Sequence, residues 1–175
     1  QAKAKEDGLT DPFTVQIEKM APPSDSQLSY ARSLDAVIPE GACKRDVTAI
    51  LSRITEEDES PDPGLVSFAH ANGVCFSRCI GKNELFRMMV YQLKGAKLAT
   101  LYAYAVYLQE MGGTFGDPRD TPIYEDIVEC AKMVENDPGL LKSLEGRSLS
   151  DYENPNRGTK VYKAVSAYLL PKIRR

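Results

Sequence analysis

An internal similarity constrains the fold of this chain more than any other feature. When the sequence is shifted by 38 positions, residues 24–54 match the stretch around residues 65–89 at apolar positions, one lysine and one acid. The matched pairs are Ser29 with Ser67, Tyr30 with Phe68, Ala31 with Ala69, Ile38 with Phe76, Lys44 with Lys82, Asp46 with Glu84, Val47 with Leu85, and Ile50 and Leu51 with Met88 and Met89. If the chain contains two copies of one small fold, similar residues are expected at the apolar core positions and at a few charged positions, as found here. The alternative is a chance similarity between two pairs of amphipathic helices.

The sequence of each copy predicts a helix, an extended loop and a second helix. In the first copy, Ser24 is the expected N-cap residue, and Gln27 three positions later completes a capping box. In the second copy, a helix is expected to start at Asp62, with Pro63 in its first turn, and to stop near Gly73. These signals are local, and they predict two helices at equivalent places.

The second helix of each copy is expected to begin near Cys43 or Gly81. Each has an acid at its third position, Asp46 or Glu84, which suits the positive end of the helix dipole. The acidic, proline-containing stretch EEDESPDP separates the copies and is typical of a linker.

The second copy, GVCFSRCIGKNELFRMM, has a glycine after its first helix, an apolar loop residue, then Gly81, Lys82 and Leu85. It resembles the SAP/HeH-type family of helix–extended-loop–helix modules. The first copy is similar to small helical segments with the pattern Q-L-x-Y-A-x-x-L…I-P-E, which occur on DNA-processing proteins of bacteria and mobile elements, including topoisomerase tails. The resemblance covers residues 24–93. Cys43 and Asp35 depart from the family pattern, because glycine is expected at both positions.

This resemblance implies a module that binds DNA in many family members and protein in others. Because two copies lie in series, it implies tandem modules over residues 23–94. The departures at Cys43 and Asp35 weaken the expectation that both copies bind the same partner.

The rest of the chain predicts further helices. Apolar residues recur at three- and four-residue steps in residues 97–111, which could also continue the last helix of the second copy through Gly95. A glycine-rich break follows, and a helix is expected to start after it at Pro122. A short helix is expected after Asp137, and then a polar loop with the sequence RSLSDYENPNRG. The last expected helix has the sequence TKVYKAVSAYLLPKI. No stretch alternates in the manner of a strand. The prediction is therefore all-α, with a flexible segment over residues 1–22, the tandem modules over 23–94 and a helical bundle over 95–175.

The bulk composition limits the classes of function. A net charge of −3 gives no global attraction to nucleic acid or to anionic membranes, so binding of either would need a local basic patch. No apolar run approaches the length of a membrane span, and the polar start predicts no signal peptide. Four irregularly spaced cysteines favour reduced thiols over disulfides. These features predict a cytoplasmic protein without a membrane partner.

The only histidine, His70, lies near Cys75 and Cys79, and with Cys43 these residues could ligate zinc. Their spacing is H-x4-C-x3-C, however, and not that of a C-x2-C knuckle, which favours core thiols and a surface histidine. A catalytic Cys–His pair would rest on one histidine, and GGTFGDP has no phosphate-loop lysine. The sequence thus predicts no metal, no cofactor, no catalytic residue and no small-molecule ligand.

Basic residues are the best indication of a binding site. Lys44 and Arg45 lie at the start of the second helix of the first copy, Lys82 at the matching place in the second copy and Arg78 in the preceding loop. Beside helix-start N–H groups they could bind phosphates. A second cluster lies near the C-terminus and comprises Arg157, Lys160, Lys163, Lys172, Arg174 and Arg175. Ordinary solubilising charge is the alternative interpretation of both clusters.

Two hypotheses of function follow. The first is a non-catalytic nucleic-acid-binding accessory protein or domain, of the kind found in phages and mobile elements. The second is a helical adaptor that binds another protein, which the acidic balance, the tyrosines and residues such as Met88 and Met89 favour. An enzyme is less well supported, because no motif supplies an assembled acid, base and nucleophile.

Overall fold

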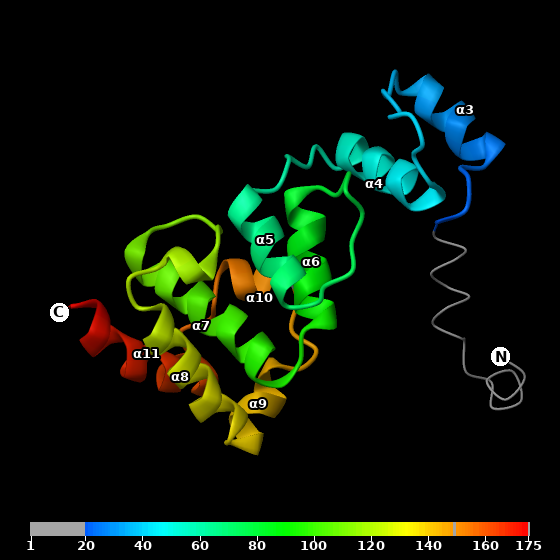
Figure 1. The fold of residues 1–175 in the computed structure, drawn as a ribbon. Coiled ribbons are helices and arrows are strands. Elements are labelled where there is room, and N and C mark those ends of the chain that lie inside the picture. The colour runs from blue at the N-terminus through cyan, green and yellow to red at the C-terminus, as the bar shows by residue number, and fades with distance from the viewer. Residues whose placement is uncertain (1–19, 149, 175) are drawn as a thin grey trace, which may run out of the picture. The chain divides into compact units, whose positions relative to one another are not determined.

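The computed structural model of the chain describes residues 20–148 and 150–174, and all regular structure in these residues is helical (Figure 1). The elements are α3 (Asp25–Ser33), α4 (Lys44–Thr55), α5 (Pro63–Ala71), α6 (Lys82–Gln92), α7 (Gly95–Met111), the short 3-10 helix η1 (Pro118–Asp120), α8 (Tyr124–Glu135), α9 (Pro138–Leu144), α10 (Ser150–Glu153) and α11 (Lys160–Ile173). The predicted all-α class is therefore confirmed. Of the segment predicted to be flexible, residues 1–19 lie outside the described part of the chain.

The described residues group into two compact units. Unit 1 comprises residues 20–60 and 76–84, and unit 2 comprises residues 61–75 and 85–174. The division falls inside α6.

In unit 1, local capping starts α3 and also ties it to α4. The Ser24 Oγ accepts a hydrogen bond from the Gln27 amide at 3.3 Å, and the Gln27 Oε1 accepts one from the Ser24 amide at 3.0 Å, so the predicted capping box is confirmed. The other end of the Gln27 amide group donates to the Thr48 Oγ1 of α4 at 2.9 Å. Ala31 and Val47 are the buried apolar residues of these two helices. One side chain therefore sets both the start of α3 and its pairing with α4.

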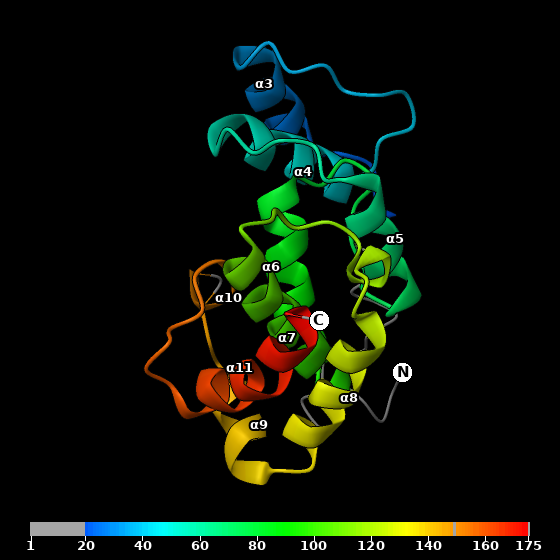
Figure 2. The same ribbon diagram turned by 90° about the vertical axis from the view of Figure 1, so that its left-hand side faces the viewer.

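Unit 2 is built around α7. Ten of its 17 residues are buried, and alanines at several positions let neighbouring helices approach closely. The helix contacts α8, α9, α10 and α11, as the two views show (Figures 1 and 2). A helix that is apolar on all sides belongs inside a protein core. Among the described residues, no helix has the length and hydropathy to cross a membrane.

The break between α6 and α7 answers the question that Gly95 raised. The two helices are separate, because α6 ends at Gln92 and α7 begins at Gly95, which has a φ of +55°. The Glu135 Oε1 accepts a hydrogen bond from the Ala96 amide at 2.9 Å, and a Cβ added to Gly95 would lie 2.6 Å from the same oxygen. A continuous helix across this point is therefore wrong. The left-handed backbone and the carboxylate over the new helix start both oppose it.

The stretch expected to be a polar loop contains a short helix, α10. Tyr152 in this helix is fully buried, and its ring meets the Tyr102 ring edge-on, with centroids 5.6 Å apart. A similar edge contact joins it to Phe86, with centroids 6.2 Å apart. The loop expectation was wrong because one buried aromatic side chain is enough to dock an otherwise polar segment on the core.

Candidate nucleic-acid interface

Backbone hydrogen bonds recur at the same spacing of 38 residues as the sequence similarity. The helices α3 and α5 each have nine residues, and their first residues are 38 positions apart. The recurring pairs are Lys44 N to Ala21 O with Lys82 N to Glu59 O, Ala36 N to Ala31 O with Val74 N to Ala69 O, and Ala42 N to Pro39 O with Ile80 N to Ser77 O. The backbone thus follows the same local path at both loop-to-helix connections.

The loop of each segment opens in the same way. Asp35 and Gly73 both have left-handed backbones, with φ of +51° and +77°. The departure of Asp35 from the expected glycine is therefore accommodated, since aspartate tolerates this region better than most residues. The next matched pair, Val37 and Cys75, is exposed, and Val37 is 87 % exposed. The expectation that Cys75 is a core thiol is wrong, because its loop position faces solvent in both segments.

At the start of α6, the carboxylate of Asp58 occupies the backbone N–H groups that a phosphate would need. Asp58 is buried and accepts hydrogen bonds from the Asn83 amide at 3.0 Å and from the Glu84 amide at 3.2 Å. A Cβ added to Gly81 would lie 2.1 Å from an Asp58 carboxylate oxygen, so the glycine makes room for this cap. Beside Lys82, a phosphate could bind these N–H groups only by displacing Asp58.

At the start of α4, a different acid, Asp46 in the first turn of the helix, forms the polar network. Its carboxylate accepts hydrogen bonds from the Ser77 hydroxyl at 2.7 Å and from the Cys43 amide at 3.3 Å, and Arg78 forms an ion pair with it at 3.4 Å. Burial alone would raise the pKa of Asp46, but these hydrogen bonds and the Arg78 charge outweigh it, and the pKa is lowered. One acid therefore joins residues of both segments within unit 1.

The four cations predicted around these helix starts differ in their surroundings. Lys44 is exposed, whereas Arg45 and Lys82 are partly buried, and none of the three forms an ion pair with a described residue. Arg78 is exposed but is neutralised by Asp46. Unit 1 has six Lys and Arg residues against nine Asp and Glu residues within residues 20–60 and 76–84. Its field is therefore unfavourable for a polyanion.

The C-terminal cations have a different arrangement. The exposed residues of α11 recur at helical spacing, and Arg174, the C-cap residue, continues the row. They are Lys160, Lys163, Ala167, Pro171 and Arg174. We call Lys160, Lys163 and Arg174 the basic stripe. The helix contains no acid, and no residue of the stripe forms an ion pair within the part of the chain that is described.

Two other cations of the predicted C-terminal cluster are held by acids: Lys172 pairs with Asp126 at 2.9 Å, and Arg157 pairs with Glu110. The Arg157 guanidinium lies 3.2 Å from the Glu110 carboxylate, which also accepts a hydrogen bond from the Tyr162 hydroxyl. Burial and the Glu110 carboxylate raise the pKa of Tyr162 to about 12. Arg157 is still 67 % exposed, so it can add to the field near the stripe. The ion pair of Arg157 with Glu110 connects the loop before α11 to the end of α7.

Charge is unevenly distributed along the sequence. Residues 154–175 contain six Lys and Arg residues and no Asp or Glu, whereas residues 1–153 contain 16 and 25 and so have a net charge of −9. Lysines at the N-terminal turn of α11 also oppose the helix dipole. Burial of Val161, Val165 and Leu169 stabilises the helix despite this. The basic stripe is therefore held by apolar packing on the other side of α11.

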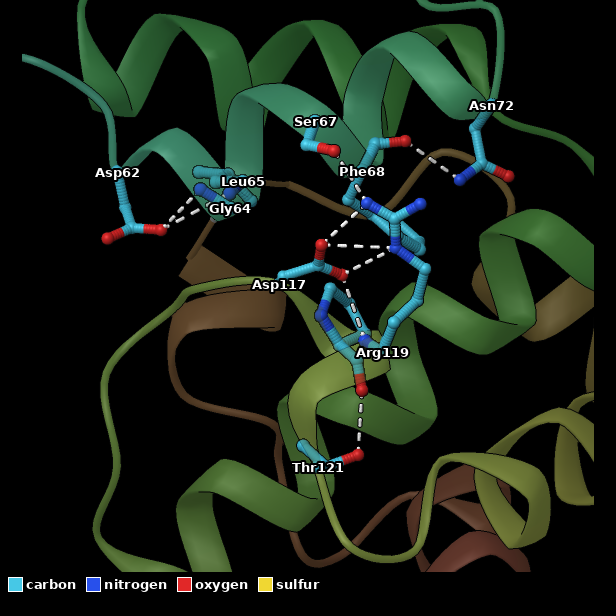
Figure 3. Close-up of polar contacts among 10 residues, drawn as sticks. Asp62, Gly64, Leu65, Ser67, Phe68, Asn72, Asp117, Arg119 and Thr121 are labelled. Carbon is cyan, nitrogen blue, oxygen red and sulfur yellow. Dashed lines mark hydrogen bonds and ion pairs between the residues drawn. The ribbon is translucent and has the colours of Figure 1, made fainter.

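A separate polar cluster joins α5 to η1 within unit 2 (Figure 3). Arg119 forms a two-point contact with Asp117, with its closest approach at 2.6 Å, and donates to the Ser67 hydroxyl of α5 at 2.7 Å. The hydrogen bonds from Arg119 lower the pKa of Asp117. Gly64 lies so close that an added Cβ would be 2.8 Å from the Asp117 Cβ. The Nε and Nη2 groups of Arg119 donate to Asp117 and Ser67, so the cluster is a joint between α5 and η1.

The candidate metal ligands are spread out. His70 and Cys75 are exposed, while Cys79 and Cys43 are partly buried. Cys130 is fully buried, and burial raises the pKa of its thiol to about 12. The described residues contain no group of three or more His, Cys, Asp and Glu side chains placed to hold a metal ion.

Sequence reasoning missed Asp58, the Asp46–Ser77–Arg78 network and the Arg119 joint. Only the proximity of the folded chain reveals these contacts. Arg174 is part of the predicted C-terminal cluster, and helical spacing places it on the same face as Lys160 and Lys163. Comparisons with family models, with curated proteins and with solved structures find no match to this chain, so the resemblance to helix–extended-loop–helix modules stays a prediction.

Proposed function

We propose that the chain is a non-catalytic nucleic-acid-binding accessory protein whose contact surface is the basic stripe of α11. The observation that carries the proposal is the row of exposed, unneutralised cations formed by Lys160, Lys163 and Arg174 on a helix without acids. Phosphate contacts supply most of the affinity of sequence-independent binding, and they need cations that solvent can reach. Acids of α7 and α8 contact other residues of α11: Asp126 pairs with Lys172, Glu129 accepts from Tyr168 and Glu110 accepts from Tyr162. None of these acids forms an ion pair with a residue of the stripe in the part of the chain that is described.

The same proposal makes the two helix–loop–helix segments tandem copies of one module, followed by a bundle around α7. The recurring hydrogen bonds and the equal spacing of α3 and α5 support it. In this view, the modules contribute Lys44 as an accessible cation. Lys82, Arg45 and Arg78 contribute less, because they are partly buried or paired with Asp46.

Fluorescence anisotropy with labelled DNA over a salt series tests the proposal. The variant Lys160→Gln/Lys163→Gln/Arg174→Gln should bind about tenfold more weakly at low salt and should show a shallower salt dependence than the natural chain. A matched control is Arg32→Gln/Lys132→Gln/Lys142→Gln, which removes the same charge from exposed positions elsewhere. The control should bind like the natural chain.

Two results would contradict the proposal. One is the absence of binding at low salt. The other is an equal loss in the stripe variant and in its control, which would show that only net charge matters. A Lys44→Gln/Lys82→Gln variant is informative beside them. We expect a loss smaller than that of the stripe variant, because the N–H groups beside Lys82 are occupied by Asp58.

A helical adaptor is the second candidate, and unit 1 favours it. Tyr30, Val37 and Ile54 are exposed apolar residues in a unit with more acids than bases. Exposed apolar residues with acidic neighbours suit a basic, amphipathic partner segment. A Val37→Asn/Ile54→Asn variant that loses a partner protein in a nuclease-treated pull-down, with unchanged DNA binding, would support the adaptor function.

A further inference from the structure

We propose that the basic stripe binds the backbone of duplex DNA across its major groove without reading the sequence. This inference rests on the proposed function and adds the kind of nucleic acid and the geometry of contact. Lys160 and Lys163 form one cationic end of the stripe, and Arg174 forms the other. Ala167 and Pro171 lie between them on the same exposed face.

The length of the stripe fits a groove. At a rise of about 1.5 Å per residue, Lys163 and Arg174 are about 16 Å apart along the helix axis, and Lys160 and Arg174 are about 21 Å apart. The major groove of B-DNA is about 12 Å wide, so the two ends can reach phosphates on both of its sides. A single cluster of cations could contact only one side.

The residues in the middle of the stripe are the reason why we expect it to bind DNA without sequence specificity. Ala167 and Pro171 have no side-chain donor or acceptor, so nothing at the centre of this face can form hydrogen bonds with base edges. The cations at the ends contact phosphates, which carry no direct sequence information. The small side chains also let the helix approach the groove closely.

The stripe lacks what single-stranded nucleic acid needs. Binding of single strands combines cations with aromatic rings on which bases stack. The two tyrosines of α11 lie off the stripe, because Tyr162 is buried against Glu110 and the Tyr168 hydroxyl donates to Glu129 at 2.9 Å. The exposed face of α11 therefore offers phosphate contacts but no stacking surface.

The test compares short duplex DNA of two unrelated sequences, the corresponding single strands and phosphatidylserine-containing vesicles, all with the full chain. We expect duplex DNA to bind at least about fivefold more tightly than single strands, equally for both sequences, with a log–log salt slope of about −3 for three phosphate contacts. A variant with Ala167→Glu should bind duplex about tenfold more weakly, because it places an anion in the middle of the stripe. Ala167→Gln is its matched control and should bind nearly as well as the natural chain.

The outcomes separate the inference from the function on which it rests. Single strands that bind as tightly as duplex, or binding that depends on the exposed Tyr91, would overturn the duplex inference and leave nucleic-acid binding in place. A preference for one duplex sequence would also overturn it. Binding to vesicles alone, or to none of the probes, would contradict the proposed function itself. Circular dichroism of each variant checks that the fold is kept.

Discussion

The segment with α3 and α4 and the segment with α5 and α6 have backbone hydrogen bonds that recur 38 residues apart, but they stabilise their second helices differently. At the start of α6, the buried carboxylate of Asp58 caps the helix from outside the loop, and Gly81 leaves space for it. At the matching positions of the first segment stand Met20 and Cys43, and Asp46 within α4 bonds back to the Cys43 amide. The two segments therefore differ at two linked positions, because a side chain at position 81 would overlap the carboxylate of an aspartate at position 58.

The first helices of the two segments differ in what covers them. The face of α5 around Gly64 and Ser67 lies against Asp117 and Arg119. The residue of α3 that matches Gly64 is Ser26, which is exposed, whereas Gly64 is partly buried. Ser67 and its match Ser29 are both exposed, but Ser67 accepts a hydrogen bond from Arg119. The first helices therefore differ in the contact with η1 that covers α5 around Gly64. Helix bounds alone do not show this difference, and the following substitutions test it.

The largest effect is expected from Gly81→Cys, which places the residue of the first segment in the second. Its Cβ would meet the Asp58 carboxylate at 2.1 Å and displace it from the Asn83 and Glu84 amides. The free energy of unfolding should fall by about 2–4 kcal/mol in urea titrations, because steric overlap adds to the loss of a buried cap. The reverse change, Cys43→Gly, should cost less than about 1 kcal/mol, since glycine is an acceptable N-cap.

A double variant makes this prediction sharper. If Gly81→Cys acts through Asp58, then Asp58→Ala should cost clearly less in the Gly81→Cys background than in the natural chain. Additive effects of the two substitutions would show that Gly81 and Asp58 are not coupled. In that case, the coordinated difference between the segments would have no steric basis.

The next effect tests the covered face of α5. Gly64→Ala would place a Cβ 2.8 Å from the Asp117 Cβ and 3.1 Å from its backbone nitrogen. Alanine in place of glycine normally stabilises a helix by about 0.5–1 kcal/mol, so a loss of about 1–3 kcal/mol in thermal or urea unfolding would reverse the usual sign. The control Ser26→Ala, at the matching exposed position of α3, should change stability by less than about 0.5 kcal/mol. A stabilised Gly64→Ala protein would show that α5 is as open as α3.

A smaller effect is expected at Asp46, whose pKa lies below its ordinary value of 3.8. A carboxyl with a lowered pKa in the folded state stabilises the fold above its unfolded value, and this contribution is lost as the pH falls through the lower, folded value. Asp46→Asn should therefore cost about 1–2 kcal/mol at neutral pH, and the difference from the natural chain should shrink below pH 3.8. Urea titrations at both pH values measure it, with exposed Asp35→Asn as the control. A cost that does not change with pH would exclude the ionised form as the source of stability.

Much of the fold could be predicted because its signals are local. The capping residues Ser24 and Asp62 lie next to the helices they start, and the periodicity of α7 and α11 needs only neighbouring residues. Asp58 and Tyr152 could not be predicted, because each acts on residues far away in the sequence. A polar or acidic stretch looks like a loop or linker until the fold supplies a buried partner.

The candidate site divides in the same way. Lys160 and Lys163 could be placed on one helix face from their spacing, and the structure exposes both. The helix-start cations Lys82 and Arg78 could not be assessed from sequence, since only the folded chain brings Asp58 to the N–H groups and Asp46 to the guanidinium. Which basic residue stays available to a partner depends on the acids that folding places beside it.

The smallest effect is expected from Arg78→Gln. The Arg78 side chain is 60 % exposed, and an ion pair in contact with water is worth about 0.5 kcal/mol or less. Ser77→Ala should cost about 1 kcal/mol, because the buried hydroxyl donates to Asp46 and accepts from the Cys79 amide. Urea titrations of the two variants compare how much the hydrogen bond and the ion pair to the Asp46 carboxylate each contribute to the free energy of unfolding. An Arg78 effect as large as that of Ser77 would mean that charge, and not the hydrogen-bonded hydroxyl, holds Asp46 to the loop of the second segment.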